Sequence, residues 1–303
     1  MNDQAARLRR MIEDKHPRSD NKSNNIQENS KPEKLSANRG PRTIAITSGK
    51  GGVGKTNLTV NLAIALGNMG KRVIIIDADM GMANVDILLG TTSRINLMSL
   101  LESDVALEDV LLRGPYGVSY ISGGSGMEHA MELTSTERDI LFRKLAGCEE
   151  WADIILIDTG AGIGGNVLDF ISAADEVLLI TTPEPTALTD AYAVMKGYSS
   201  ISDNPNLKLI VNRVIDEPEI REVVGTLSRT AERFLKISVE CLGYIYDDQM
   251  MIKSVRQQVP VMAGYPESIS SRCILSIAKG LLNGHQEKVK LGWRGFLKRI
   301  FRS

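Results

Sequence analysis

A glycine-rich loop constrains this chain more than any other feature. The run GKGGVGKT follows an apolar stretch typical of a buried strand, 43–48, and precedes a stretch with helical periodicity, 57–69. Glycines let such a loop curl until its N–H groups point inward, and the positive end of the next helix adds to the attraction for an anion. The sequence therefore predicts a nucleoside-triphosphate site. Its phosphate contacts are expected from Gly49, Lys50, Gly51, Gly52, Val53, Gly54, Lys55 and Thr56.

Two residues of this motif have separate expected roles. Lys55 is placed to reach the β- and γ-phosphates, and Thr56 is placed to bring its hydroxyl to Mg²⁺. The motif therefore predicts a nucleoside triphosphate with Mg²⁺ as the ligand pair.

Apolar strand-like runs alternate with helical periodicity over the remainder of the chain. The strand-like runs lie at 43–47, 72–76, 118–121, 154–157, 177–181, 208–211 and 242–245. Helical periodicity is clearest at 57–69, 135–147, 187–201, 219–235 and 268–282. This alternation is typical of a mostly parallel sheet covered by helices on both faces, and we expect an α/β fold.

Charge and composition divide the chain into parts. With 303 residues, 43% of them hydrophobic, the chain can bury one full core. The formal net charge is −1, but residues 1–42 carry +4 and residues 286–303 carry +5, so 43–285 carries −10. We expect an N-terminal segment (1–15), a disordered linker (16–42), an α/β domain (43–285) and a C-terminal helix (286–303). The acidic domain disfavours DNA binding as the main activity, because neutralising phosphates needs a basic surface.

The cysteines and the apolar runs bear on metal chemistry and on location. Cys148, Cys241 and Cys273 are scattered without a Cys-x-x-Cys pair, which argues against zinc and iron–sulfur sites. No secretory signal is visible, and no apolar run approaches the roughly 20 residues that span a bilayer. We expect a cytoplasmic protein that lies at most on a membrane surface.

Carboxylates follow two of the expected strands. In parallel sheets the ligand site lies beyond the carboxyl ends of the strands, and the run 154–157 ends in Asp158 there. An aspartate in this position can simply cap the next turn. Beside a phosphate loop we interpret Asp158 as a Mg²⁺ carboxylate acting with Thr56. Gly162, in the turn that follows, is predicted to offer its N–H to the γ-phosphate.

Lys50 stands inside the loop, where the general motif accepts any residue. It cannot easily fold back onto its own phosphates, but it could cross to a nucleotide on a facing subunit and neutralise charge there. A solvated loop lysine is the alternative. The stretch KGGVGKT closely resembles the deviant Walker A loop of the MinD/ParA family of dimerising ATPases. The resemblance implies an ATP-dependent homodimer in which Lys50 acts catalytically across the interface.

The segment after the strand at 72–76 resembles switch I of the MinD family, in the pattern Asp-x-Asp…Asn-x-Asp. By this resemblance Asp77 assists Mg²⁺ coordination, and Asp79 orients or deprotonates the attacking water. Asn84 and Asp86 are expected to shape the switch.

The run 208–211 ends in Asn212 and Arg213, not in the Asn-Lys-x-Asp that reads guanine. In the MinD/ParA family an asparagine here contacts adenine. The resemblance therefore favours ATP over GTP.

The segment 288–302 is basic and aromatic. As a helix it places its large apolar side chains on one face and its basic side chains on the other, which is typical of a helix that binds an anionic membrane surface. Docking on the domain core is the alternative, and the two are compatible if ATP releases the helix. The expected membrane face consists of Trp293, Phe296, Leu297, Ile300 and Phe301.

The first residues resemble the DQAxxLR motif of FlhG-type proteins (also called YlxH or FleN), which are MinD-like ATPases that regulate flagellar number and placement. This resemblance is supported by the segments 158–163, 182–190 and 255–261. It implies that the N-terminal segment stimulates an FlhF-type GTPase of the signal-recognition-particle class, with flagellar switch and C-ring proteins as further partners. The alternative is a ParA-like partition ATPase that binds DNA as an ATP dimer. The expected GTPase contacts are Asp3, Gln4, Leu8 and Arg9.

Overall fold

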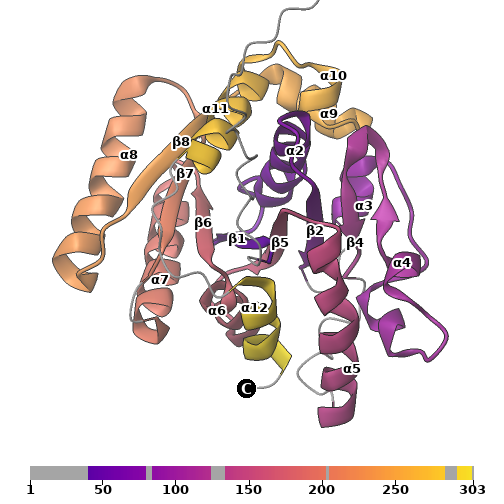
Figure 1. Cartoon of the computed structure of the whole chain (residues 1–303). Coiled ribbons are helices and arrows are strands. Elements are labelled where there is room, and N and C mark those ends of the chain that lie inside the picture. Colours follow the sequence, from indigo (N-terminus) through magenta and orange to yellow (C-terminus); the bar gives the residue numbers. More distant parts are fainter. Residues whose placement is uncertain (1–39, 80–83, 124–133, 203–204, 284–291, 302–303) are drawn as a thin grey trace, which may run out of the picture. The chain divides into compact units, whose positions relative to one another are not determined.

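The computed structural model describes residues 40–79, 84–123, 134–202, 205–283 and 292–301, all of which belong to one unit, Arg39–Ser303. Their core is a sheet whose strands are β1 (Arg42–Ser48), β2 (Val73–Ala78), β3 (Leu112–Arg113), β4 (Ser119–Ile121), β5 (Ile154–Ala161), β6 (Glu176–Thr181), β7 (Leu207–Val214) and β8 (Glu240–Tyr246). Their order across the sheet is β3-β4-β2-β5-β1-β6-β7-β8, seen in Figure 1. Within the described residues β3 and β4 are antiparallel and the other neighbours are parallel, so the expected α/β fold is confirmed.

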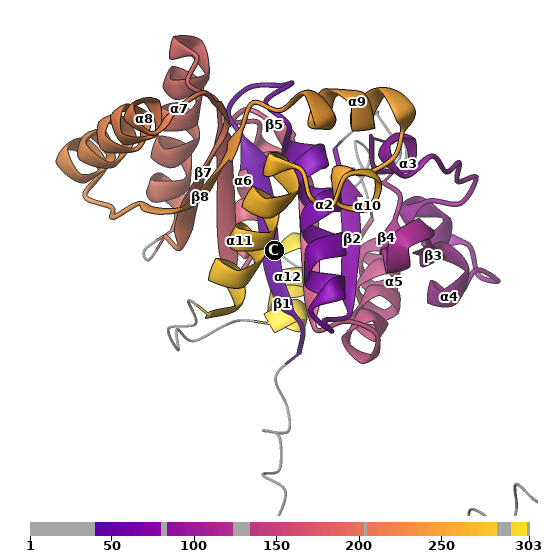
Figure 2. The same ribbon diagram turned by 90° about the horizontal axis from the view of Figure 1, so that it is seen from above.

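Helices cover both faces of this sheet (Figures 1 and 2). Side chains of a strand alternate between its faces, and β1 divides its core contacts accordingly, with Ile44 and Ile46 in one cluster and Ala45 in the other. The first cluster includes side chains of α2 (Lys55–Asn68), α3 (Asn84–Leu89), α10 (Val261–Gly264) and α11 (Ile269–Asn283). The second includes side chains of α4 (Leu107–Val110), α5 (Ser135–Ala146), α6 (Gly165–Ala173), α7 (Pro185–Ile201), α8 (Glu217–Thr230) and α12 (Gly292–Phe301).

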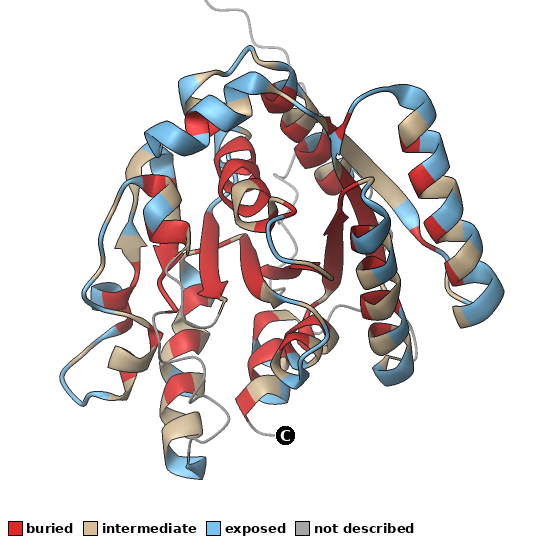
Figure 3. Cartoon of the chain, turned by 180° about the vertical axis from the view of Figure 1, so that it is seen from behind, coloured by how far each residue is buried: buried red, intermediate tan, exposed pale blue. Residues whose placement is uncertain are grey.

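Burial follows this layering. Figure 3 shows the central strands in the buried colour and the outward faces of the covering helices exposed. β1 and β6 are buried along their whole length. Such strands read as continuous apolar runs in the sequence, which is why their positions could be predicted.

Several elements differ from the expected ones. The short antiparallel strand β3 and the helices α3, α6 and α9 (Gln249–Gln257) were not expected. The helix expected at 219–235 is divided, because α8 ends at Thr230 and a π-helical turn follows, Ala231–Leu235. β5 and β7 extend past their apolar runs, since their polar ends still pair in the ladder. No described helix is both long and apolar enough to cross a membrane.

The C-terminal helix α12 packs against the domain. Trp293, Phe296, Leu297 and Phe301 are 1%, 2%, 0% and 5% exposed, and Ile300 packs partly buried beside them. The Phe296 ring stacks between the rings of Trp293 (5.3 Å between centroids) and Phe170 of α6 (6.2 Å). The face expected to meet a membrane therefore lies in the protein's own core, which is the docked alternative.

Polar contacts hold the same helix at its first turn. The backbone N–H of Gly292 donates to Asp175 Oδ1 at 3.1 Å, and Trp293 Nε1 donates to the carbonyl of Leu145 at 2.6 Å. Arg294 pairs with Glu149 at 2.9 Å. The buried indole N–H has a hydrogen-bond partner, so docking of α12 does not incur the free-energy cost of an unsatisfied buried donor.

Candidate functional site

The phosphate loop joins β1 to α2, and its glycines have different physical tasks. Gly52 and Gly54 adopt φ of 78° and 98°, a region that side chains rarely occupy. A Cβ on Gly54 would also lie 2.5 Å from Asn212 Nδ2. A Cβ on Gly49 would lie 2.2 Å from the backbone carbonyl carbon of Asp190 in α7, whereas a Cβ on Gly51 would meet nothing within 4 Å.

A cavity of about 370 Å³ opens above this loop, at the carboxyl ends of the strands. Its walls come from the loop, the start of α2, the end of β2, helix α3 and the end of β5. This is the edge at which parallel sheets bind ligands. The residues that line it are Ser48, Gly51, Gly52, Gly54, Lys55, Thr56, Asn57, Asp79, Asn84, Ile87, Leu88, Ala161 and Arg213. Gly49, Lys50 and Val53 of the loop do not line the cavity, and Val53 is buried.

Lys55 projects into the base of this cavity and is only 7% exposed. Its Nζ lies 3.5 Å from Asp158 Oδ1 and 3.6 Å from Asp79 Oδ2. The carboxylates that compensate the ammonium charge also hold it where a triphosphate would meet it. Contact of Lys55 with the β- and γ-phosphates stays a prediction.

Asp158 is fully buried at the end of the apolar part of β5. Burial raises its pKa, while the neighbouring Lys55 ammonium and the hydroxyls of Thr56 and Thr59 oppose that rise without cancelling it. Thr59 Oγ1 donates to Asp158 Oδ1 at 3.0 Å. The second carboxylate oxygen, Oδ2, is buried and has no hydrogen-bond partner among the described residues. An orphaned carboxylate oxygen beside a threonine hydroxyl fits the hard-oxygen preference of Mg²⁺.

Asp77 lies beside Asp158 at the end of β2 and is 1% exposed. It accepts the backbone N–H of Asp79 at 3.2 Å and that of Val85 at 3.3 Å. Burial, followed by the charge of Asp158, raises the pKa of Asp77 to about 7. Among the described residues no cluster of His, Cys, Asp or Glu is sufficient to hold a metal ion. Phosphate oxygens and water would therefore have to complete a Mg²⁺ shell here, as is usual for this ion.

The polar residues of the segment expected to form switch I lie in two different environments. Asn84 Nδ2 donates to Asp79 Oδ2 at 3.0 Å, and both residues line the cavity. Asp86, in contrast, is 5% exposed and accepts from Ser122 Oγ at 3.0 Å, away from the cavity lining. Asp79 and Asn84 are thus placed to act on a ligand, and Asp86 anchors α3 to the end of β4.

Lys50 does not line the cavity. Its Nζ donates to Glu184 Oε2 at 3.0 Å and to Thr186 Oγ1 at 2.9 Å, at the start of α7. The Lys50 and Glu184 side chains remain 40% and 55% exposed. The interaction with Lys50 is also the main cause of the lowered pKa of Glu184. Lys55 therefore lies in the cavity of its own subunit, whereas Lys50 of the same loop lies outside that cavity, at the start of α7.

Asn212 and Arg213 brace the loop from β7. Asn212 Nδ2 donates to the carbonyl of Val53 at 2.7 Å, and an Arg213 Nη donates to that of Gly52 at 3.0 Å. Arg213 lines the cavity and adopts a left-handed φ of 58°. The contacts seen for Asn212 support the loop, and contact with adenine stays a prediction.

The N–H of Gly162, expected at the γ-phosphate, donates instead to the carbonyl of Ser48 at 2.8 Å. This bond would have to break before that N–H met a phosphate. Sequence reasoning also missed Thr59, Glu184 and Thr186. Little in the sequence indicates them, because threonine and glutamate are common near the starts of helices whether or not they belong to a functional site. The four expected GTPase contacts, Asp3, Gln4, Leu8 and Arg9, lie outside the described residues.

Comparison with known sequences identifies relatives. A ParA family model, described as an NUBPL iron-transfer P-loop NTPase, matches residues 41–282. The chain is 38% identical to the antiactivator FleN of Pseudomonas aeruginosa over 78% of this chain and 85% of FleN. It is 34% identical to the flagellum site-determining protein YlxH of Helicobacter pylori over 100% of this chain and 99% of YlxH.

Solved structures give the same relationship. The MinC:MinD cell division complex of Aquifex aeolicus matches with a TM-score of 0.64 and 28% identity, over 82% of this chain and 98% of that chain. MinD of Pyrococcus horikoshii, complexed with Mg-ADP, matches with a TM-score of 0.63 and 28% identity, over 80% and 98% of the two chains. The chain therefore belongs to the ParA/MinD family of nucleotide- and Mg²⁺-binding P-loop ATPases, within the group that includes FleN and YlxH.

Proposed function

We propose that this protein is an ATP-driven dimer switch that regulates flagellar number or placement from the membrane surface. The observation that carries the proposal is the divergence of Lys50 and Lys55. Lys55 faces the cavity of its own subunit, whereas Lys50 is held outside that cavity on an exposed edge. A cation in that position is available to the nucleotide of a second copy, where it would neutralise charge in phosphoryl transfer.

The same residues define the expected chemistry. Thr56, Asp77 and Asp158 would hold Mg²⁺, which supplies Lewis-acid stabilisation of the phosphate oxygens when bound. Asp79, fixed by Asn84 at 3.0 Å, orients the attacking water. The two strands that end in Asp77 and Asp158 are direct neighbours in the sheet, so these carboxylates arrive together without a special loop.

Apolar side chains at the same edge support dimerisation. Ile87 of α3, Ile163 after β5 and Ile215 after β7 are 53%, 54% and 78% exposed. Each lies at or beyond the carboxyl end of the sheet, and Ile87 also lines the cavity. Large exposed aliphatic side chains around a site mark an interaction surface, and a second copy facing the first would cover them.

The docked helix α12 couples the nucleotide state to membrane binding. α6, which carries Phe170 against Phe296, begins at Gly165, shortly after the predicted γ-phosphate contact Gly162. A shift of that segment when Gly162 exchanges its bond to Ser48 for a phosphate would move α6 under the tail. Helix α12, once released, would present its aromatic face and basic flank to anionic lipid.

The flagellar role rests on the relatives. The match to YlxH covers 100% of this chain and so includes residues 1–15. We propose that residues 1–15, on the linker 16–42, stimulate an FlhF-type GTPase, and that switch or C-ring proteins are further partners. A peptide of residues 1–16 is expected to raise GTP hydrolysis by that GTPase, and Gln4→Ala is expected to weaken the effect. A peptide without effect, where the full chain is active, would rule this segment out.

The central experiment measures mass and lipid binding together. Asp79→Ala is expected to remain dimeric by light scattering in Mg-ATP, because the water is no longer oriented while phosphate contacts persist, and to be monomeric in ADP. The same ATP sample is expected to sediment with anionic liposomes. A monomeric Asp79→Ala protein in saturating Mg-ATP contradicts the switch, and deletion of 286–303 without loss of sedimentation contradicts the tail's role.

A further inference from the structure

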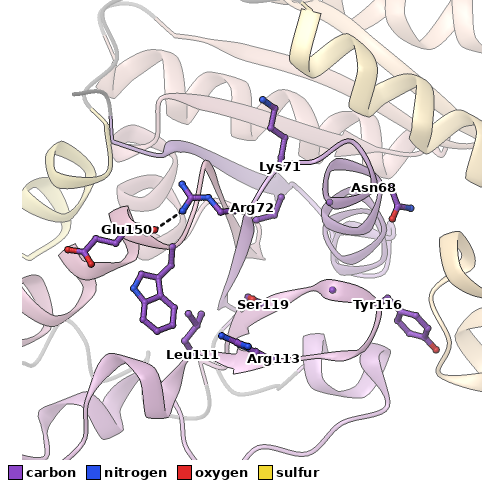
Figure 4. A pocket seen from close by; sticks show the side chains of 12 residues that line it. Asn68, Lys71, Arg72, Leu111, Arg113, Tyr116, Ser119 and Glu150 are labelled. Atoms are coloured by element: carbon purple, nitrogen blue, oxygen red, sulfur yellow. Dashed lines mark hydrogen bonds between the residues drawn. The ribbon is translucent and has the colours of Figure 1, made fainter. Parts of the chain in front are cut away.

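Strand β4 has polar side chains towards both of its ends. At its amino end Ser119 lines a hollow of about 690 Å³, whose other walls include residues of α2, β2 and β3 (Figure 4). Towards the carboxyl end lie Tyr120 and the residue that follows the strand, Ser122, which are 2% and 3% exposed. Tyr120 and Ser122 are two positions apart, so their side chains project to the same face of the sheet. On that face Tyr120 packs in one core cluster with Val85 and Leu89 of α3.

The first polar contact between the end of β4 and α3 is made by Asp86. Its Oδ2 accepts from Ser122 Oγ at 3.0 Å, whereas its Oδ1 is buried and has no hydrogen-bond partner among the described residues. The backbone of Ser122 is fixed in turn, because its carbonyl accepts the N–H of Leu97 at 2.8 Å. Burial of a carboxylate with one oxygen unsatisfied costs free energy, so Asp86 points to a role other than packing.

The second contact holds the backbone of the same residue. The carbonyl of Asp86 accepts the N–H of Thr91 at 2.9 Å and the Thr91 hydroxyl at 3.3 Å. The hydroxyls of Thr91 and Tyr120 share a hydrogen bond of 2.8 Å. Burial raises the pKa of Tyr120 to about 12, so its hydroxyl keeps its proton at neutral pH. Asp86 is therefore linked to the end of β4 through its side chain and, by way of Thr91, through its backbone.

Helix α3 connects these contacts to the nucleotide cavity. It begins at Asn84, whose amide donates to Asp79 Oδ2 at 3.0 Å. The N–H of Val85 also donates to Asp77 Oδ2 at 3.3 Å, but Asp77 belongs to the proposed Mg²⁺ site. The contacts with the end of β4 come from residues that do not line the cavity, so a ligand there does not compete for them.

We propose that Thr91, Tyr120 and Ser122, here called the α3 brace, are positioning residues for ATP hydrolysis. The brace fixes α3 against β4, and the fixed helix presents Asn84 to the carboxylate of Asp79 that orients the attacking water. A misplacement of about 1 Å can cost about 100-fold in rate, so a short helix that carries such a contact needs support from outside the site. The inference rests on the function proposed above for Asp79.

Two variants of the brace test the effect on turnover. Tyr120→Phe and Ser122→Ala each remove one hydroxyl, and each should lower kcat for ATP about tenfold while changing the affinity for a fluorescent ATP analogue less than about twofold. Tyr198→Phe is the matched control, since Tyr198 is 3% exposed and its hydroxyl accepts the N–H of Asn206 at 3.4 Å, before β7. The control should turn over ATP as the wild type does. Wild-type kcat in both brace variants would overturn the inference.

Hydrogen exchange tests the brace without any nucleotide. Mass spectrometry of the peptide that covers 84–91 should show faster exchange in Tyr120→Phe and Ser122→Ala than in the wild type, because α3 opens more often once a contact with β4 is lost. Tyr198→Phe should leave exchange of this peptide unchanged. Unaltered exchange in both brace variants would mean that these hydroxyls do not hold α3.

A double-variant cycle separates positioning from a general loss of structure. Because the brace acts through Asp79, Tyr120→Phe should lower single-turnover hydrolysis of radiolabelled ATP about tenfold in the wild-type chain and have no further effect in Asp79→Ala. An additional loss of the same size in Asp79→Ala would overturn the inference and leave the role of Asp79 intact. Undiminished hydrolysis by Asp79→Ala itself would overturn the proposed function, and this inference with it.

Discussion

The ammonium group of Lys50 lies 3.0 Å from Oε2 of Glu184, so the lysine expected to act across a dimer is paired within its own subunit. Both side chains are substantially exposed, and solvent screening leaves exposed ion pairs with little net free energy. The ion pair therefore positions Lys50 at the start of α7, but it is weak enough to be broken easily. Exchange of Glu184 for a phosphate of a facing subunit needs little free energy.

Lys50→Ala is expected to bind ATP normally but to lose ATP-dependent dimerisation and turnover. The cause is that Lys50 lies outside its own cavity and contributes only in trans. Binding of a fluorescent ATP analogue and steady-state phosphate release measure the two properties. Lys279→Ala, which removes an exposed lysine of α11, is the control. Turnover by the Lys50 variant equal to that of the wild type would exclude the in-trans role.

Lys55→Ala is expected to abolish triphosphate binding and to destabilise the fold by about 3–5 kcal/mol, because it leaves the buried Asp158 uncompensated. Burial raises the pKa of Asp158 in the folded state, and the loss of Lys55 raises it further. The folded variant then binds more protons than the unfolded chain. Its stability should fall by up to about 1.4 kcal/mol per pH unit above the unfolded pKa, near 4.

Denaturant unfolding at several pH values measures this effect. The double variant Lys55→Met/Asp158→Asn removes both charges and should recover much of the stability with little pH dependence. A Lys55→Ala loss that does not grow with pH would mean that Asp158 is not the group left uncompensated.

Ile215→Asp is expected to weaken the ATP-dependent dimer at least about tenfold, since it places a charge where a facing subunit would bury an aliphatic side chain. Analytical ultracentrifugation in Mg-ATP measures the dimer. Ile201→Asp is the matched control, because Ile201 is 47% exposed but lies at the C-terminal end of α7. Equal dimer affinity of both variants would show that Ile215 does not lie in the interface.

Phe170→Ala is expected to release the tail helix without ATP, because it removes the ring that stacks on Phe296 and leaves a cavity under α12. Sedimentation with anionic liposomes in the presence of ADP should increase, and the increase should disappear at high salt. Phe234→Ala, which truncates a ring that is 62% exposed, is the control. Unchanged sedimentation of a folded Phe170→Ala protein would mean that α6 does not hold the tail.

Asp248→Ala is expected to destabilise the protein by about 1–2 kcal/mol. Asp248 caps α9 by accepting from Met250 N at 2.8 Å, and it also holds the first turn of α11 through Ser270 N at 3.1 Å. Burial raises its pKa, but the bonds from Ser270 and Met250 outweigh burial and lower it. The stabilisation is therefore present above the usual pKa of an aspartate and is lost as the pH falls. Thermal melts of both proteins should converge in acid.

The sheet could be predicted because β1, β2, β5, β6 and β7 contain buried runs that only a covered sheet accommodates. β3 could not, since a two-residue edge strand has no periodicity to detect. Helices α3 and α9 span only 6 and 9 residues, which is too short for a helical period to be recognised with certainty in the sequence. The phosphate loop could be predicted because its phosphate contacts come from residues that are adjacent in the sequence.

The rest of the site depends on contacts between segments that are distant in the chain. Glu184 follows Lys50 by 134 positions, and no local pattern links them. The tail shows another limit. An apolar stripe on a basic helix meets the needs of a membrane and of a protein core equally well, so the sequence left both readings of Trp293 and Phe296 open. The burial of these side chains and the ring stack on Phe170 show where the stripe lies in this structure.

The glycines of the phosphate loop imply three distinct evolutionary constraints within one short motif. Substitutions at Gly49 would be eliminated for their effect on folding, since a side chain there collides with the backbone of α7. Those at Gly52 and Gly54 would be eliminated because the loop needs left-handed backbone. Gly51 has neither problem, so purifying selection at that position would report directly on the ligand.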